Sequence, residues 1–161
     1  MQITAPTWRY QDRLITAIAD MPDNTFGFIY EVKHIPTGIK YIGKKVLYFE
    51  RNKRLGVKAL EKLKEERKAA GIGGRVPAKE KVISESDWKT YYGSHPQIKQ
   101  LLKETGPESF TRTILVFVPN KKLLTYYETK YLFINEVLEN RDNYINDNVL
   151  GKFYRKDFYN D

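Results

Sequence analysis

A stretch near the start of the chain, GFIYEVKHIPTGIKYIGKK at residues 27–45, constrains the fold more than any other segment. Two runs rich in β-branched and aromatic residues, 26–34 and 39–47, lie on either side of a Pro-Thr-Gly turn. Strand-forming runs joined by so short a connection predict an antiparallel β-hairpin. We therefore expect the sheet of this protein to be built on these two strands.

The turn also determines which side chains share a face of the hairpin. A register that pairs the residues on either side of the turn places Tyr30 opposite Gly43, on the face that also carries Tyr41 and Lys45. A shift by one residue would replace Lys45 by Lys44. In the first register, the two phenols and an ammonium would border Gly43. Because Gly43 has no side chain, a ligand could approach the sheet there. Tyrosine is also a good strand residue, so the spacing alone leaves a structural interpretation open.

The rest of the chain alternates helical and extended patterns. Apolar residues recur at helical spacing in four segments, which are residues 7–20, 53–70, 96–105 and 121–139. The most apolar run, 110–118, predicts a buried central strand. This order predicts an α+β fold with a small three-stranded antiparallel sheet flanked by helices, in a domain over 26–150. Residues 1–25 are then a helical extension and residues 151–161 a C-terminal tail.

The positive charge of the chain is concentrated in one segment. The net charge is +8, and residues 44–81 contain 13 Lys and Arg against 5 Asp and Glu, which accounts for all of it. A localised basic region predicts a polyanionic partner, although a solvated helix of mixed charge is the alternative. We expect a basic helical insertion over about 50–83. Its basic residues are the predicted nucleic-acid contacts, namely Lys53, Arg54, Lys58, Arg67, Lys68 and Arg75.

Composition excludes several classes of site. The chain has no cysteine and only two histidines, so disulfides, cysteine-ligated metals and a histidine-rich metal site are not expected. It has no run of apolar residues long enough to span a membrane, and its N-terminus lacks a signal-peptide pattern. The expected environment is therefore the cytoplasm, with no membrane partner.

Glu128 lies at the edge of the apolar stripe of the last predicted helix. On a helix with 3.6 residues per turn, it falls about 90° from the centre of the stripe that contains Leu124 and Tyr131. A carboxylate at that position can reach a cleft without entering the core. An ordinary surface glutamate would fit the same position, so the pattern is compatible with both interpretations.

An ordered set of motifs resembles the GIY-YIG nuclease superfamily, and within it the Seg-type homing endonucleases of phages. FIY at residues 28–30 corresponds to the first half-motif, with Phe28 in place of the usual glycine, and YIG at residues 41–43 is intact. The resemblance continues through YYGSHPQIKQLLKETGPESFTRTIL and LLTYYETKYL and covers about residues 26–150. It implies a phage-encoded endonuclease that depends on Mg²⁺ or Mn²⁺ and acts on double-stranded DNA in the host cytoplasm.

The resemblance also implies roles for individual residues. Tyr30 corresponds to a general base or water-positioning group, Tyr41 to a second active-site phenol, and Glu128 to the metal ligand. A phenol has a pKa near ~10, so nearby cations would have to lower the pKa of Tyr30 if it acts as a base. The remaining matches are less defined. The cation is Lys44, Lys45 or Arg51; the additional tyrosine is Tyr92; and the late asparagine is Asn146, with Asn143 and Asn148 as neighbours.

Two other functions fit parts of the sequence. A non-catalytic nucleic-acid-binding module on the same fold is the main alternative, because Phe28 replaces a motif glycine. A nuclease of the PD-(D/E)xK kind would use DWK at residues 87–89 and ETK at residues 128–130. Such triplets arise often by chance in a highly charged chain, and the second lies within a predicted helix instead of a strand. The sequence does not indicate an oligomeric state.

Overall fold

The main sheet has five strands in the order β2-β1-β7-β3-β4, in a computed structural model that describes residues 6–159. The strands are β1 (Trp8–Tyr10), β2 (Arg13–Ile15), β3 (Gly27–His34), β4 (Lys40–Val46) and β7 (Phe110–Val118). Neighbouring strands are antiparallel except for β1 and β7, which are parallel. The α+β class is confirmed, and the three predicted strands form one side of the sheet. The predicted strand number is wrong, because β1 and β2 extend the sheet beyond β7.

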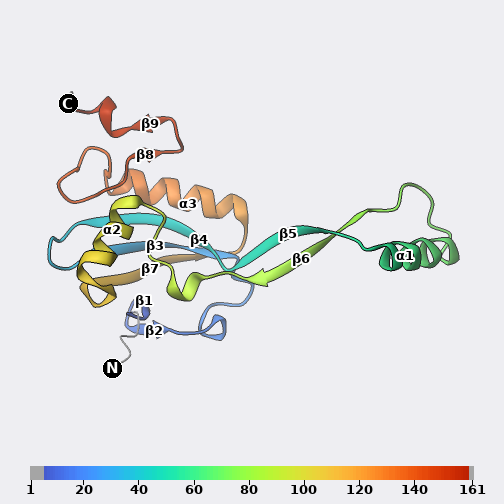
Figure 1. The fold of residues 1–161 in the computed structure, drawn as a ribbon. Coiled ribbons are helices and arrows are strands. Elements are labelled where there is room, and N and C mark those ends of the chain that lie inside the picture. The colour runs from blue at the N-terminus through green and yellow to red at the C-terminus, as the bar shows by residue number, and fades with distance from the viewer. Residues whose placement is uncertain (1–5, 160–161) are drawn as a thin grey trace. The chain divides into compact units, whose positions relative to one another are not determined.

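The chain divides into two compact units, one formed by the chain up to Leu47 and from Asp87 onward and the other by Tyr48–Ser86. The first unit also contains α2 (Pro96–Thr105), α3 (Lys121–Ile134), β8 (Asn148–Val149) and β9 (Phe153–Tyr154). The second unit consists of β5 (Tyr48–Arg54), α1 (Val57–Ala69) and β6 (Lys79–Glu85) (Figure 1). The described residues also form short 3-10 helices, η1 (Ile18–Asp20), η2 (Trp88–Thr90), η3 (Pro107–Ser109) and η4 (Arg155–Asp157).

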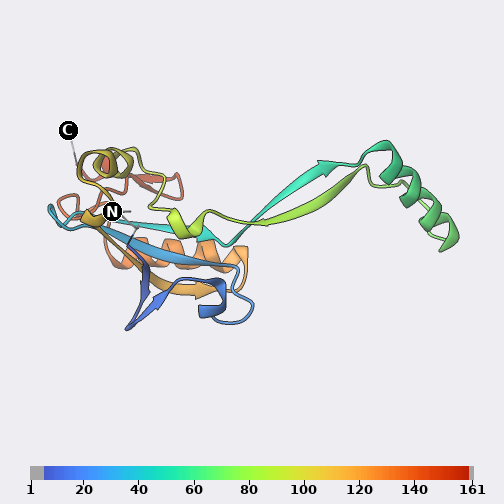
Figure 2. The same ribbon diagram turned by 60° about the horizontal axis from the view of Figure 1, so that its bottom comes forward.

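Hydrophobic side chains cover both faces of the main sheet. Consecutive residues of β3 point to opposite faces, so Phe28 and Tyr30 join one cluster and Ile29 joins the other. The first cluster also contains Trp8, Trp88, Ile98 and Phe110. The second contains Ile42, Leu124, Leu132, Val137 and Leu138. Figure 2 shows α3 running along the sheet, and its apolar stripe buries the second face. Strand β4, which carries YIG, is the last strand in the order of the sheet, and α3 packs on the second face of the sheet.

The helix predicted over 7–20, and with it the helical N-terminal extension, is wrong. These residues form the β1–β2 hairpin and η1. Gln11, with a φ of 52°, provides the turn, and Trp8 pairs with Ile15 across the hairpin. The indole of Trp8 is buried and donates a hydrogen bond of 2.7 Å to the carbonyl of Trp88. Burial of this large side chain against the sheet outweighs a weak local preference for helix.

The second unit also differs from the prediction. The helix predicted over 53–70 begins only at Val57, because Lys53 and Arg54 belong to β5. Strand β6 pairs with β5 in register along its whole length, in a segment expected to be loop. Every residue of β5 is exposed, and so is every residue of β6 except Val82. A ribbon that is solvated on both faces lacks the alternation of apolar and polar residues by which strands are recognised in a sequence.

The last predicted helix, 121–139, ends earlier than its apolar spacing suggested. Helix α3 stops at Ile134, and Glu136 adopts a φ of 50° in the turns that follow. Val137 and Leu138 lie beyond the helix end but are buried. The apolar spacing therefore continues past Ile134 because these residues pack in the core. In the part of the chain that the structure describes, no helix is both long and apolar enough to cross a membrane.

Candidate active site

Tyr30 lies opposite Gly43, as the predicted register requires. Tyr30 is only 1% exposed, and its phenol occupies the space above the glycine. A Cβ added to Gly43 would lie 2.5 Å from the Tyr30 hydroxyl and 2.7 Å from Cζ. The position predicted to admit a ligand is therefore filled by the tyrosine itself, and the glycine is required by this close approach.

Tyr41 is the more accessible of the two motif phenols. It is half-buried, and its ring lies 6.3 Å from the Tyr30 ring. Its hydroxyl shares a hydrogen bond with Ser94, and its ring lies 5.8 Å from the imidazole of His95. Tyr41 therefore joins the strand face to the segment that precedes α2, and its hydroxyl is the better placed of the two to meet a substrate.

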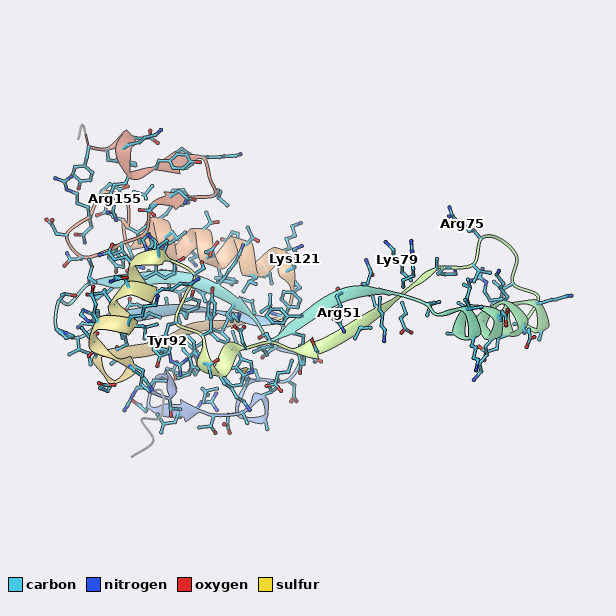
Figure 3. The ribbon with its side chains drawn as sticks, in the orientation of Figure 1. Arg51, Arg75, Lys79, Tyr92, Lys121 and Arg155 are labelled. Carbon is cyan, nitrogen blue, oxygen red and sulfur yellow. The ribbon has the colours of Figure 1, made fainter. Side chains whose placement is uncertain are left out.

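The third tyrosine beside these phenols is Tyr91, and not Tyr92 as predicted. The Tyr91 ring lies 5.9 Å from that of Tyr30, and the two side chains share a hydrogen bond. Tyr92 packs instead against Phe110 and Arg112, and its buried hydroxyl has no hydrogen-bond partner (Figure 3). Adjacent tyrosines in an extended segment point to opposite sides, so the YYGS motif did not show which one faces the site.

The three candidate cations have different surroundings. Lys45 is 8% exposed, and its Nζ lies 2.5 Å from Asp87 Oδ1 and 3.8 Å above the centre of the Tyr91 ring. The hydrogen bond from Lys45 lowers the pKa of Asp87. Lys44 is on the other face of β4. Arg51 is exposed on β5, in the second unit, opposite Val82 (Figure 3). Lys45 is thus the cation that shares a face with the phenols.

Glu128 is on α3, whose N-terminus is capped by the Asn120 side chain. Its carboxylate lies 3.5 Å from the ammonium of Lys44 and is largely shielded from solvent. Burial is the main cause of the raised pKa of Tyr30 and of Tyr41, and the negative charge of Glu128 adds to it. The three side chains are therefore within electrostatic range of one another, although α3 packs on the opposite face of the sheet from the phenols.

A family model described as "Putative endonuclease segE, GIY-YIG domain" matches residues 8–149. The chain belongs to this GIY-YIG family. No curated protein and no solved structure matches the chain. The match begins at Trp8, so the β1–β2 hairpin falls within the GIY-YIG domain, whereas the sequence motifs had indicated a start near residue 26.

Phe28, the departure from the GIY half-motif, is accommodated in the core of this GIY-YIG domain. It is fully buried, and its ring meets the Trp8 ring edge-on at 5.1 Å. Gly27 precedes it, and any side chain there would collide with the carbonyl of Lys45. Phe28 is paired with Lys45 across the hairpin, and its ring is enclosed by the core beside Tyr30.

Both phenols of the GIY-YIG motif are protonated at neutral pH. Burial raises the pKa of Tyr30 well above 10.0, and the neighbouring phenols and Glu128 raise it further. Burial also raises the pKa of Tyr41. The causes of the raised pKa of Tyr30 include no cation, so a lowering by a cation or a bound metal stays a prediction. Tyr30 and Tyr41 are thus suited to donate hydrogen bonds and to position a water or phosphate, but not to act as bases.

Asn146 holds the YIG strand in place. Its buried side-chain amide donates to the carbonyl of Ile42 at 2.8 Å and accepts from the Ile42 N–H at 3.1 Å. These two bonds pair the backbone N–H and carbonyl of Ile42, on the free edge of β4 between Tyr41 and Gly43. Since both ends of the amide bond the backbone, the structure indicates a positioning role for Asn146, whereas the resemblance had implied direct action in the site.

Asn146→Asp is expected to lower the free energy of unfolding by about 1–3 kcal/mol, because a carboxylate oxygen would face the Ile42 carbonyl without a proton between them. Urea denaturation at neutral pH measures this loss. The matched control is Asn143→Asp, whose amide makes only an exposed bond to Asn140 and whose change should cost no more than about 0.5 kcal/mol. Equal losses at the two positions would contradict the role given to Asn146.

His95 lies next to Tyr41 and, with its partner Asp147, was not among the predicted site residues. The Nδ1 of His95 accepts from the N–H of Gln97 at 3.1 Å and caps α2. Its Nε2 lies 2.7 Å from Asp147 Oδ2, and in the neutral ring this nitrogen is the donor. The signal was present in SHPQ, because a histidine before a proline at the first helical position is a capping pattern. His95 therefore links α2 to the segment that carries Asn146.

Glu128, the metal ligand implied by the family resemblance, belongs to no cluster of three acidic or histidine side chains among the described residues. Within residues 6–159, no group of three or more acidic or histidine side chains is arranged to hold a metal ion. Mg²⁺ commonly binds through one or two carboxylates, with waters and substrate phosphates completing its coordination. Glu128 fits this kind of site, in which the nucleic acid supplies the other oxygens.

Proposed function

We propose that this GIY-YIG protein is a Mg²⁺-dependent endonuclease that hydrolyses phosphodiester bonds in double-stranded DNA. The observation that supports it is the match of the family model to residues 8–149, which include the YIG strand and Glu128, whose carboxylate lies 3.5 Å from the Lys44 ammonium on that strand. If the protein is phage-encoded, as the family resemblance suggests, it would act in the cytoplasm of the host.

The chain contributes positioned donors and charges to the reaction. The hydroxyl of Tyr41, a half-buried residue, can donate to a phosphate oxygen or to the attacking water. The Tyr30 ring, 6.3 Å from the Tyr41 ring, helps to position it. Lys45, held by Asp87 and by the Tyr91 ring, places a positive charge on the same face, where it can stabilise charge on the phosphate. When bound at Glu128, a divalent ion supplies a water of lowered pKa and neutralises developing charge.

The test is cleavage of supercoiled plasmid with Mg²⁺, compared with a reaction in EDTA. Conversion to nicked or linear plasmid in Mg²⁺ alone is the expected result. Salt-sensitive binding to DNA without cleavage of any DNA or RNA would contradict the proposal and favour a non-catalytic module instead. Phe28 does not favour that alternative, because its side chain is accommodated in the core.

As the pH is lowered, the rate of cleavage is expected to fall at a higher pH than it would if Glu128 had the pKa of an ordinary glutamate. Burial raises the pKa of Glu128 above 4.5, so the carboxylate becomes protonated, and loses its metal, while the pH is still above that value. Lys44 lowers the same pKa. Lys44→Met should therefore move the acid limb of the kcat/KM profile to still higher pH.

The control for this shift is Lys122→Met, an exposed lysine on the same helix as Glu128. Its profile should overlay that of the unmodified protein. An acid limb that stays in place after Lys44→Met, whatever the change in maximal rate, would show that Glu128 does not control it.

A further inference from the structure

The second unit lacks the core that would make it stable and rigid by itself. The β5–β6 ribbon is exposed on both faces apart from Val82, and α1 has no buried residue. A two-stranded ribbon without a packed face is marginally stable in water. Packing therefore does not explain the choice of residues in this unit. The placement of its charged side chains indicates its role.

One face of the ribbon gathers side chains that repel one another. In an antiparallel pair, residues directly opposite point to the same face. Arg54 is opposite Lys79, and Asn52 is opposite Lys81, so the end of this face next to α1 carries three positive charges and an amide, whereas Glu50 and Glu85 lie on the same face toward its other end. We call these four residues the basic ribbon face. The other face instead pairs Lys53 with Glu80, which are opposite in charge.

Like charges directly opposite destabilise a β-ribbon. Lys81 has a partial counter-charge, since its Nζ lies 3.6 Å from Glu50. Among residues 6–159, neither Arg54 nor Lys79 has a salt bridge or a side-chain hydrogen bond. Figure 3 shows Lys79 on the ribbon and Arg75 in the loop beyond it, both extending into solvent. An anionic partner would turn this unfavourable pair into a favourable one.

The shape and chemistry of the face fit duplex DNA. Two paired strands are ~4.8 Å apart, and the major groove, about 12 Å wide, admits a two-stranded ribbon. Arginine, lysine and asparagine donate to phosphates and to base edges in that groove. Helix α1 is a poorer candidate because it alternates Lys with Glu, and its Arg67 is used to bind the carbonyl of Gly73 at 3.0 Å.

We propose that the basic ribbon face binds in the major groove of double-stranded DNA, with Arg54, Lys79 and Lys81 as its principal contacts. This deepens the proposed function, because it assigns duplex binding to a surface that contains none of the candidate catalytic residues. Arg51 is on the opposite face of the ribbon. This assignment also revises the predicted contacts, since Lys53 is on the opposite ribbon face, Arg67 binds the carbonyl of Gly73, and Lys79 and Lys81 are added.

The test is the affinity for a 30-bp duplex in EDTA, measured by fluorescence anisotropy at several salt concentrations. Arg54→Ala with Lys79→Ala should weaken binding by about 30-fold and lower the salt slope by about two. The matched control, Lys53→Ala with Lys64→Ala, removes the same charge from the same unit and should weaken binding by less than about 3-fold. Equal losses in the two double variants would overturn the assignment of the face.

A further variant separates binding from folding. Lys79→Glu places a negative charge opposite Arg54, so it should not lower the melting temperature, yet it should weaken duplex binding at least as much as the double alanine variant. Unchanged affinity would overturn the proposal, as would an equal loss on a single strand of the same sequence. Because EDTA prevents metal-dependent cleavage, these results are independent of whether the protein proves to be a nuclease.

Discussion

Glu128→Gln is expected to lower the rate of Mg²⁺-dependent cleavage by about 10³-fold, the largest single loss in this protein. Glutamine keeps the size and polarity of the side chain but removes the charge that binds the metal. It also removes the partner of Lys44, a partly exposed pair whose loss should change stability little. The measurement is single-turnover cleavage of plasmid DNA, together with duplex affinity in EDTA, which should be unchanged.

The matched control is Glu139→Gln, an exposed acid that follows α3. Its rate should be within about 2-fold of that of the unmodified protein. If Glu128→Gln retained full Mg²⁺-dependent activity, the metal would have to be held elsewhere. No group in the described part of the chain, Glu128 included, offers three acidic or histidine ligands.

Tyr41→Phe is expected to lower the cleavage rate by about 10²-fold. The substitution removes one hydroxyl from a half-buried ring and leaves the ring contacts with Tyr30 and His95 in place. Because the pKa of Tyr41 is raised above 10.0, the hydroxyl acts as a donor and not as a base. The loss should therefore be the same at pH 7 and at pH 9.

Tyr126→Phe, an exposed tyrosine on α3, is the control and should leave the rate unchanged. A loss for Tyr41→Phe that grows steeply between pH 7 and pH 9 would indicate that a Tyr41 phenolate acts as the base. That result would contradict the role as a donor derived from its burial.

The sequence predicted the parts of the fold that local patterns determine. The hairpin register, the strand over 110–118 and the helix opened by Pro96 are all present. The β1–β2 hairpin was missed, because Trp8 is extended only through burial against distant residues. The β5–β6 ribbon was missed because it has no buried face to produce an alternating pattern.

For the site, the motifs placed the candidate residues on two strands and a helix that the structure contains, but they did not predict the environment of each side chain. The protonation of Tyr30 and the closed space above Gly43 depend on burial, which spacing does not reveal. The choice between Tyr91 and Tyr92 depends on which way an extended segment faces. The role of Asn146 depends on a contact with Ile42, 104 residues away in the chain.

The central claim is that the Tyr41 hydroxyl and the Glu128 carboxylate act on the same phosphodiester. A double-mutant cycle in single-turnover cleavage, with Tyr41→Phe, Glu128→Gln and both together, tests it most directly. Groups that act as a unit are strongly non-additive, so the double variant should be no more than about 3-fold slower than Glu128→Gln alone. Multiplication of the two single losses, to about 10⁵-fold, would show that the two residues act independently and would contradict the account.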